Sequence, residues 1–507
     1  MSLDLALSIA RSGLSHVNRQ LAQSAANVAN AATPGYTRKE VQGTSNASGG
    51  ISAGVRSLEA TRAVDTALVT QMNAARAATG EAQARALLLE GVEVAHGAAG
   101  QSIGDLTAAL GDAFVSLRAD PSDTLLQSRT ADAAGELAAR YNTVSAAIQT
   151  ARQAAQDGMV ADVGRLNGAI RQVSALTDQI IPMKAQGMST AELEDQRDAA
   201  IAGISSILQV RAALQPDGGV VLVSAGGLTL PLRTPDGPFS IEARTVAPGS
   251  FHGDGGTLPG VMLVGIDVTA QLGKGSLAAY AGLRDKDLPL AQAELDVSAG
   301  SLASRFDSQG LRLFTNGAGA VPDPGTPYKD GGWIGFAGSI RLGEAVAANP
   351  ALLRDGTHAI TASPVGATDF TPNPAGGPAG FTTLLDRVLD RTFGTEAAPG
   401  SPHPAFASTE LGPDGTLFSR VRPARTLADQ AAQLVSTQTA LRPEAEAAGK
   451  ASGDLLGSLE TRYAARSGVD MDKELAAMVT LQTAYSANAR IVSVVQTMYD
   501  TLLQAVR

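Results

Sequence analysis

Residues 478–502 read MVTLQTAYSANARIVSVVQTMYDTL, a stretch in which apolar side chains recur in alternating steps of three and four residues. A period of 3.5 residues is typical of a helix that packs along a narrow seam against another helix. The positions of this C-terminal seam are Met478, Leu481, Tyr485, Asn488, Val492, Val495, Tyr499 and Leu502. All but Asn488 are apolar or aromatic, so we expect a helix over about residues 470–507 that needs a partner helix.

A second seam of the same kind lies at the other end of the chain. Its positions step by four and three residues, and they are Leu3, Leu7, Ala10, Leu14, Val17, Leu21, Ser24 and Val28. Because each narrow seam needs a helix to cover it, the pattern predicts that the two termini pair as a coiled-coil-like domain. The pattern also leaves open that two ordinary amphipathic helices dock separately on a larger core.

The composition suits a protein of several domains and excludes some classes of function. A chain of 507 residues is long enough for roughly three domains of about 150 residues each. The net charge of −10, without a basic block, argues against nucleic acid as a partner. The chain has no cysteine, which excludes disulfides, thiol catalysis and cysteine-based metal sites.

The sequence also indicates how the chain relates to membranes and export. No run approaches the ~20 apolar residues that a membrane-spanning helix needs. Residues 1–10 contain Asp4 but no Lys or Arg, so we expect no cleavable signal peptide. If the protein leaves the cytoplasm, we therefore expect a route that does not read a standard signal sequence.

Hydrophobic periodicity predicts a mainly α protein with β-rich parts. Helical patterns cover about residues 62–96, 106–117, 125–181, 193–208, 276–309 and 427–467. Strand-like patterns follow Val210, as in residues 220–223 and 228–230, whereas residues 310–420 are rich in Gly and Pro. This nested order predicts a terminal coiled-coil-like domain, a helical domain with a β segment at about 210–270, and an inserted β-rich domain. Their expected bounds are 1–60 plus 467–507, 61–309 plus 421–466, and 310–420, respectively.

Catalytic and metal-binding patterns are missing from the sequence. The chain has no phosphate-binding loop, no nucleophile elbow and no HExxH motif. None of the histidines is paired at metal-ligand spacing; they are His16, His96, His252, His358 and His403. We therefore predict a protein that is not an enzyme and holds neither cofactor nor metal.

The end of the first helix carries the most specific motif of the chain. The segment Asn27-Val28-Ala29-Asn30-Ala31-Ala32-Thr33-Pro34-Gly35-Tyr36 combines a helix stop with Pro34-Gly35, which fits the two central positions of a type II turn. The turn explains Pro34 and Gly35 but not the helical spacing of Asn27 and Asn30. The segment resembles the N-terminal signature of bacterial flagellar axial proteins, although Ala32 stands where the family usually has Asn.

Two further segments narrow the resemblance. The run Asp195-Gln196-Arg197-Asp198, near the start of a predicted helix, and the stretch from Ser467 to Ala489 both resemble the flagellar hook-associated protein 1 family. Lys473 departs from an acidic residue common in that family. On the residues alone, an acidic helix start with a solvated Arg197 also explains the first of these segments.

The resemblance implies a structural, exported protein of the flagellum that joins the hook to the filament. It implies self-association in a helical ring, contacts with the hook protein and the next junction protein, and an export chaperone at the C-terminal region. Neither nucleic acid nor membrane is an expected partner. Two alternatives stay open, namely another axial protein of the hook or distal rod, and a secreted cell-wall hydrolase with axial-type ends.

Overall fold

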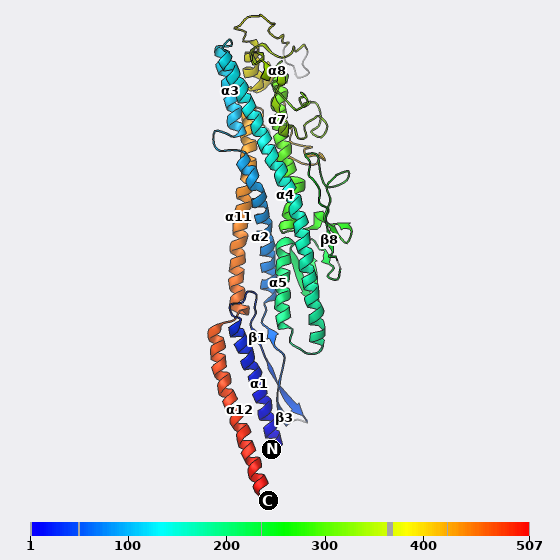
Figure 1. The fold of residues 1–507 in the computed structure, drawn as a ribbon, viewed down its shortest axis with the longest axis vertical. Coiled ribbons are helices and arrows are strands. Elements are labelled where there is room, and N and C mark those ends of the chain that lie inside the picture. The colour runs from blue at the N-terminus through cyan, green and yellow to red at the C-terminus, as the bar shows by residue number, and fades with distance from the viewer. Residues whose placement is uncertain (1–2, 49–50, 235, 362–368, 423, 506–507) are drawn as a thin grey trace.

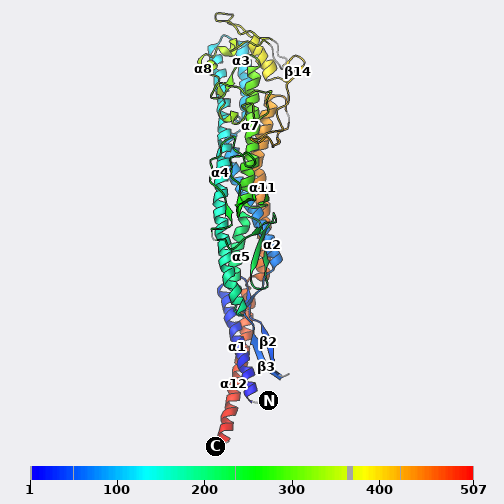
Figure 2. The ribbon, with the colours of Figure 1, turned by 90° about the vertical axis from the view of Figure 1, so that its right-hand side faces the viewer.

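The computed structural model describes residues 3–48, 51–234, 236–361, 369–422 and 424–505. Figure 1 shows an elongated molecule with both termini at the same end. There, helix α1 (Leu3–Ala29) and helix α12 (Met471–Ala505) lie side by side in both ribbon views (Figures 1 and 2). The expected pairing of the two termini is therefore confirmed as a two-helix stalk below a larger helical body.

Long helices build the body, and polar caps explain where several of them begin. They are α2 (Thr66–Ala95), α3 (Ile103–Ala119), α4 (Thr124–Ala185), α5 (Ala191–Ile207) and α11 (Leu427–Ser467). The side chains of Asp65, Ser102 and Asp123 accept hydrogen bonds from the first free amides of α2, α3 and α4. All five match the predicted helical stretches to within a few residues, except that α4 continues through Pro182 to Ala185.

Helix α7 (Leu288–Asp307) runs through the centre of the body. It follows α6 (Ser276–Gly282) through a π-helical turn, η2 (Leu283–Asp287), and its residues are buried on every face. The main hydrophobic core surrounds it with side chains from α2, α3, α4 and α11. A second core joins the lower part of α4 to α5 and to two small sheets.

The β structure consists of small antiparallel units. The hairpin of β2 (Gly43–Ser48) and β3 (Ile51–Ser57) and the pair β1 (Lys39–Glu40) with β4 (Thr61–Arg62) lie between α1 and α2. The predicted β segment forms two sheets, one of β5 (Val210–Leu214), β6 (Val220–Ser224) and β7 (Thr229–Leu230). The other contains β8 (Phe239–Ser240), β9 (Met262–Leu263) and β10 (Ile266–Asp267), followed by the 3-10 turn η1 (Thr269–Gln271). Strands 220–223 and 228–230 pair as expected, with Leu222 opposite Leu230.

Residues 310–420 differ from the β-rich domain that we predicted. Their described part is mostly irregular, with short helices and two-stranded pairs: β11 (Phe314–Thr315), η3 (Phe336–Gly338), β12 (Arg341–Leu342), α8 (Glu344–Ala348), α9 (Leu352–Asp355), α10 (Thr383–Arg387), η4 (Val388–Thr392), β13 (Glu396–Ala398) and β14 (Ser401–Pro402). Apolar side chains such as Trp333 and Phe336 enter the core around α7. Burial against helices thus orders this segment where strand pairing was expected.

The coarse fold class is a mainly helical protein with several small sheets and a terminal pair of helices. The exact division into three domains stays a prediction. Part of residues 310–420 contributes side chains to the core of the helical body. A domain boundary near residue 310 would therefore divide that core.

Candidate assembly site

The two terminal helices run antiparallel, and three contacts define their register. The Ser24 hydroxyl donates a hydrogen bond to Glu474, and the Tyr499 hydroxyl donates one to Asp4. Between these ends, the Oδ1 atom of Asn488 would lie 3.1 Å from a Cβ atom placed on Gly13. Gly13 therefore lets the two helices approach closely where Asn488 crosses α1.

Most predicted seam residues turn toward this interface. On α1, Val17 is 7% exposed and Leu3, Leu7, Leu14, Leu21 and Val28 are half-buried. On α12, Val495 is 5% exposed, and its half-buried neighbours on the seam are Met478, Leu481, Asn488, Val492 and Tyr499. Tyr485 and Leu502 lie at the margin and are exposed. A straight helix of 3.6 residues per turn drifts away from a strict 3.5-residue pattern, so some seam positions rotate out of the contact.

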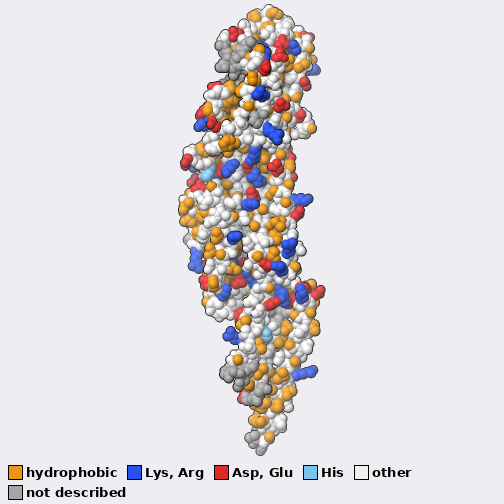
Figure 3. All heavy atoms as spheres, turned by 180° about the vertical axis from the view of Figure 1, so that it is seen from behind, with side chains coloured by type: hydrophobic (Ala, Val, Ile, Leu, Met, Phe, Trp, Pro, Cys, Tyr) orange, Lys and Arg blue, Asp and Glu red, His pale blue; other side chains and the backbone are white. Residues whose placement is uncertain are grey.

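Helix α12 carries further exposed apolar side chains beside the seam, of which the sequence analysis named only Leu502, as a seam position. We call them the outer patch: Ile491, Val494, Met498 and Leu502, whose side chains are 48–57% exposed. Figure 3 shows hydrophobic side chains gathered toward this lower end of the molecule. The steps of three and four residues between these positions were readable in the sequence. The seam pattern beside them is stronger, however, and only that pattern was interpreted as a contact surface. Contiguous exposed apolar side chains commonly mark a protein–protein contact.

The asparagines of the signature motif hold the chain that returns from α1. Asn27 is 1% exposed, and its side-chain amide bonds to both backbone groups of Lys39, with Nδ2 donating to the carbonyl at 2.9 Å and Oδ1 accepting from the amide at 3.2 Å. The Tyr36 hydroxyl also donates to Asn27 Oδ1, at 3.0 Å. Asn30 Nδ2 donates to the Ala26 carbonyl at 2.9 Å. Asn27 thus acts as a strand-like partner for Lys39, which explains its place one turn before the helix stop.

The turn after the helix has the predicted geometry. Gly35 has a φ of +80°, and the Tyr36 amide donates to the Thr33 carbonyl at 3.2 Å. This positive φ at the third position of the turn suits a glycine in a type II turn. Beyond the turn, the Lys39 ammonium lies 3.5 Å from the centroid of the Tyr36 ring, in a cation–π contact.

The second motif meets the first at the joint between the stalk and the body. Asp195 is 6% exposed and accepts hydrogen bonds from the Thr37 amide at 3.2 Å and the Thr37 hydroxyl at 2.6 Å, across 158 residues of sequence. It also pairs with Lys39 Nζ at 3.0 Å. Gln196 is exposed and points elsewhere. Two separated family signatures are therefore parts of one contact.

Arg197 is not solvated, in contrast to the interpretation of this segment as a simple acidic helix start. It is 2% exposed, and its Nη1 atom donates to the Gly218 carbonyl at 2.7 Å. Arg197 thus holds the β5–β6 turn, whereas its neighbour Asp198 faces the joint and pairs with Arg62 at 2.8 Å. Burial raises the pKa of Asp198, and the Arg62 guanidinium acts against that rise.

Several residues of the joint were missed from the sequence. Glu474 is 2% exposed and accepts from Arg38 Nε at 2.6 Å as well as from Ser24. Burial acts to raise the pKa of Glu474, but the hydrogen bonds from Ser24 and Arg38 outweigh it and lower the pKa. Glu474 stands four residues before Met478, so its place on the seam was readable. Arg38 and Arg62 carried no such signal.

Metal-binding clusters and membrane-spanning helices are both absent from the described residues. Across that part of the chain, no three His, Asp or Glu side chains converge in a way that could hold a metal ion. Among the same residues, no helix has the length and apolar character needed to cross a bilayer.

Two family models match parts of the chain. Residues 89–319 match the helical domain of the flagellar hook-associated protein FlgK, and residues 461–505 match the C-terminal region of the flagellar basal body rod FlgEFG proteins. The first covers the upper part of α2 through α7 and the second covers α12. The matched segments thus include α3, α4, α5 and α7 of the body, only the ends of α2 and α11, and the helix that bears the outer patch.

One curated protein and one solved structure are similar to part of the chain. Flagellar hook-associated protein 1 of Bacillus subtilis is 24% identical over 236 residues, which are 44% of this chain and 46% of that protein. The flagellar hook junction protein FlgK of Burkholderia pseudomallei is similar at 20% identity with a TM-score of 0.38, over 50% of this chain and 45% of that one. The chain thus matches about half the length of each relative.

Proposed function

Because the chain belongs to the family of FlgK-like flagellar hook-associated proteins, we propose that it is a structural component of the flagellar axis that joins the hook to the filament. The observation that carries this proposal is the outer patch of α12. The helix that matches the axial rod proteins pairs with α1 through its seam and leaves exposed apolar side chains beside that seam, where Val494, Met498 and Leu502 line an open groove with Leu3 of α1. Apolar surface of this kind is stabilised when a neighbouring molecule covers it.

In this proposal, the stalk is the assembly domain and the seam residues hold α1 to α12 within each copy. Copies associate side by side in a helical ring, with the hook protein on one side and the next junction protein on the other. A head-to-tail contact between different surfaces generates such a ring or helix. The C-terminal region would bind an export chaperone before assembly, because its apolar patch needs cover at that stage as well.

The helical body distinguishes a hook–filament junction protein from the other axial proteins. Hook and rod proteins would share the signature around Thr33-Pro34-Gly35-Tyr36, but the match over residues 89–319 is to the helical domain of FlgK. We therefore favour the hook–filament junction over the hook or the distal rod. We also propose that the protein is exported to the extracellular flagellum.

The proposal is tested by locating the protein on isolated flagella. Antibody to this chain should label a short zone between hook and filament in electron micrographs, and a strain that lacks the gene provides the control. Label along the whole hook, along the filament or in the basal body would contradict the junction assignment.

A further inference from the structure

The stalk and the body share no hydrophobic core in the part of the chain that the structure describes. The described residues form three hydrophobic clusters, and none of these clusters includes a residue of α1 or α12. Hydrogen bonds and ion pairs that cross the joint are made on the stalk side by Thr37, Arg38, Lys39, Ala60 and Arg62. Polar interfaces between domains generally permit relative motion unless specific contacts prevent it.

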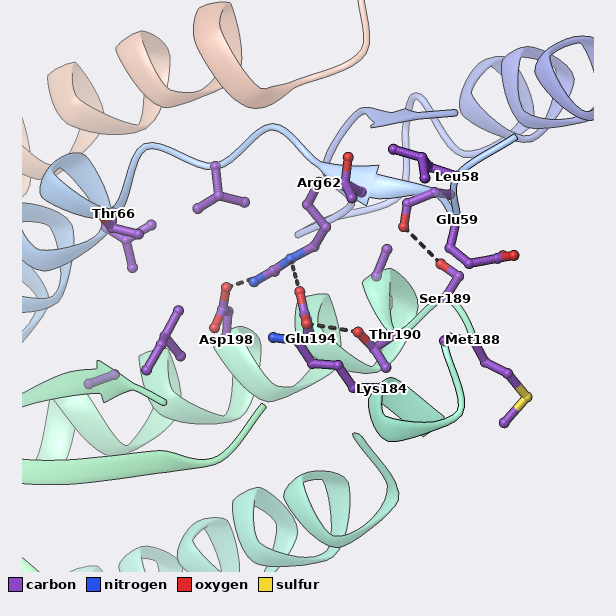
Figure 4. A pocket seen from close by; sticks show the side chains of 18 of the residues that line it. Leu58, Glu59, Arg62, Thr66, Lys184, Met188, Ser189, Thr190, Glu194 and Asp198 are labelled. Atoms are coloured by element: carbon purple, nitrogen blue, oxygen red, sulfur yellow. Dashed lines mark hydrogen bonds and ion pairs between the residues drawn. The ribbon is translucent and has the colours of Figure 1, made fainter. Parts of the chain in front are cut away.

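Arg62 makes the largest set of these contacts. It stands on β4, and its side chain is 6% exposed where it meets the first turns of α5. Its Nη1 atom lies 2.9 Å from Asp195 and 2.8 Å from Asp198, and its Nε atom lies 2.9 Å from Glu194. Figure 4 shows the guanidinium pointing between Glu194 and Asp198, at the wall of a cavity of about 880 Å³. Charge-assisted bonds of this kind give direction as well as strength.

Lys39 also forms ion pairs with acidic side chains of α5. Its Nζ atom lies 2.7 Å from Glu192 and 3.0 Å from Asp195. The acidic side chains of α5 at the joint thus face two cations that come from β1 and β4, strands that pair with each other. Arg197 bonds to the Gly218 carbonyl and acts on the cluster only through its nearby charge, which opposes the rise that burial causes in the pKa of Asp198. Without Arg62, the carboxylates of Glu194, Asp195 and Asp198 would remain close together with less positive charge to offset their mutual repulsion.

The chain segment that connects α11 of the body to α12 of the stalk is short. Helices α11 and α12 are separated at Gly468, where a Cβ atom would lie 2.4 Å from the Ala464 carbonyl oxygen. The Arg38 amide bonds to the neighbouring Ser467 carbonyl at 2.8 Å. A few residues at the end of an element are the usual place where a hinge absorbs a change in backbone angles.

We propose that Arg62 is a positioning residue: through Glu194, Asp195 and Asp198 it holds the stalk at one angle to the body, about a hinge at Gly468. The inference deepens the proposed function, because it names the contact that orients the assembly domain, and it rests on that function for its biological meaning. The angle itself is a property of the isolated monomer. Its test is therefore independent of whether the protein assembles at a hook–filament junction.

The natural absence of cysteine allows a direct measurement. Spin labels at Ser15→Cys on the stalk and Ala175→Cys on α4 report the distance between stalk and body, and both positions are exposed. With Arg62 present, we expect a single narrow distance distribution. Arg62→Met should make that distribution roughly two-fold wider or shift it, whereas Arg62→Lys should restore part of the order.

A matched control separates orientation from general loss of charge. Arg19→Met removes an exposed arginine that pairs with Glu59 at 3.3 Å within the stalk, and it should leave the distribution unchanged. The thermal transition of the body should be similar in all these variants. If Arg62→Met does not fold, Asp198→Asn removes one of the three links and should widen the distribution to a smaller degree. An unchanged narrow distribution in Arg62→Met, or in a folded Asp198→Asn where Arg62→Met fails, would overturn the proposal.

Discussion

Replacing Val495 with aspartate tests the packing of the stalk at the most buried apolar seam position of α12. Val495 is 5% exposed on α12, and interpolation between the contacts of Asn488 with Gly13 and of Tyr499 with Asp4 places it near Leu7. Burial of a valine side chain contributes about 1.5–3 kcal/mol. A polar group left there without a partner costs about a further 1–3 kcal/mol.

The sum of about 2.5–6 kcal/mol lowers the equilibrium constant for pairing of α1 with α12 by a factor of roughly a hundred to a few tens of thousands. Helices in water depend mainly on tertiary packing, so a two-helix stalk without its own large core has little reserve against this loss. The body keeps its separate cores, so we expect its melting transition to stay within a few degrees of that of the wild type.

The control is Val494→Asp on the same helix. Val494 is 57% exposed, so the same substitution adds the same charge without disturbing the seam. Its effect on the folded monomer should be within about 0.5 kcal/mol. Far-UV circular dichroism and hydrogen exchange of residues 3–29 and 471–505 should report loss of the helical pair in Val495→Asp only.

The cellular assay extends the test to function. In a strain that lacks the native gene, Val495→Asp should give hooks without filaments, and flagellin should be lost to the medium. If such cells swim with normal filaments, either the seam or the junction assignment is wrong. If the monomer keeps its helical pair, the burial argument fails irrespective of the cell result.

Three further predictions concern the register, the order of the free monomer and the response to pH. Asn488→Leu should increase association through α12 but broaden the set of particles, because a buried polar residue restricts register; uniform, unchanged particles in sedimentation would contradict this. In the free wild-type monomer, residues 1–35 and 470–507 should exchange their amide hydrogens faster than residues 125–180, because narrow seams and chain ends fray, yet more slowly than in Val495→Asp; equal protection of the terminal and body segments would refute the expectation. Burial lowers the pKa of His96, whose ring is 0% exposed and whose Nε2 lies 3.1 Å from Gln438 Oε1. The unfolded chain therefore takes up the proton more readily, and stability is lost as the pH falls below about 6.5. His96→Gln should weaken this dependence in thermal melts at about pH 7.5 and 5.5, and equal losses in both proteins would contradict the assignment.

Much of the local structure was predictable because its causes lie within a few residues of one another. Val17 and Val495 stand in repeating patterns that require a helix with one covered face. Pro34 and Gly35 specify a tight turn through their own backbone preferences. The paired strands 220–223 and 228–230 follow from β-branched residues and the intervening glycines.

The irregular segment shows where this local reasoning ends. Trp333, Phe336 and the glycines around them suggested strands and turns, yet these side chains are buried against helix α7. A short apolar run looks alike whether it pairs in a sheet or covers a helix, so periodicity could not distinguish the two. Pro182 is a second case in which local reasoning fails. The helical pattern was expected to end just before this proline, but α4 continues for about one more turn, to Ala185.

By itself, the sequence determined that the termini form helices with complementary seams, because side-chain spacing along a helix is a local property. Only the tertiary structure decided that Asp195 meets Thr37, that Arg197 is buried against Gly218, and that Arg62 closes the joint. These contacts join residues that are up to 158 positions apart, and each depends on where whole helices pack. An acidic helix start has the same sequence whether it faces water or a guanidinium, so its role emerges only when the fold brings the partner to it.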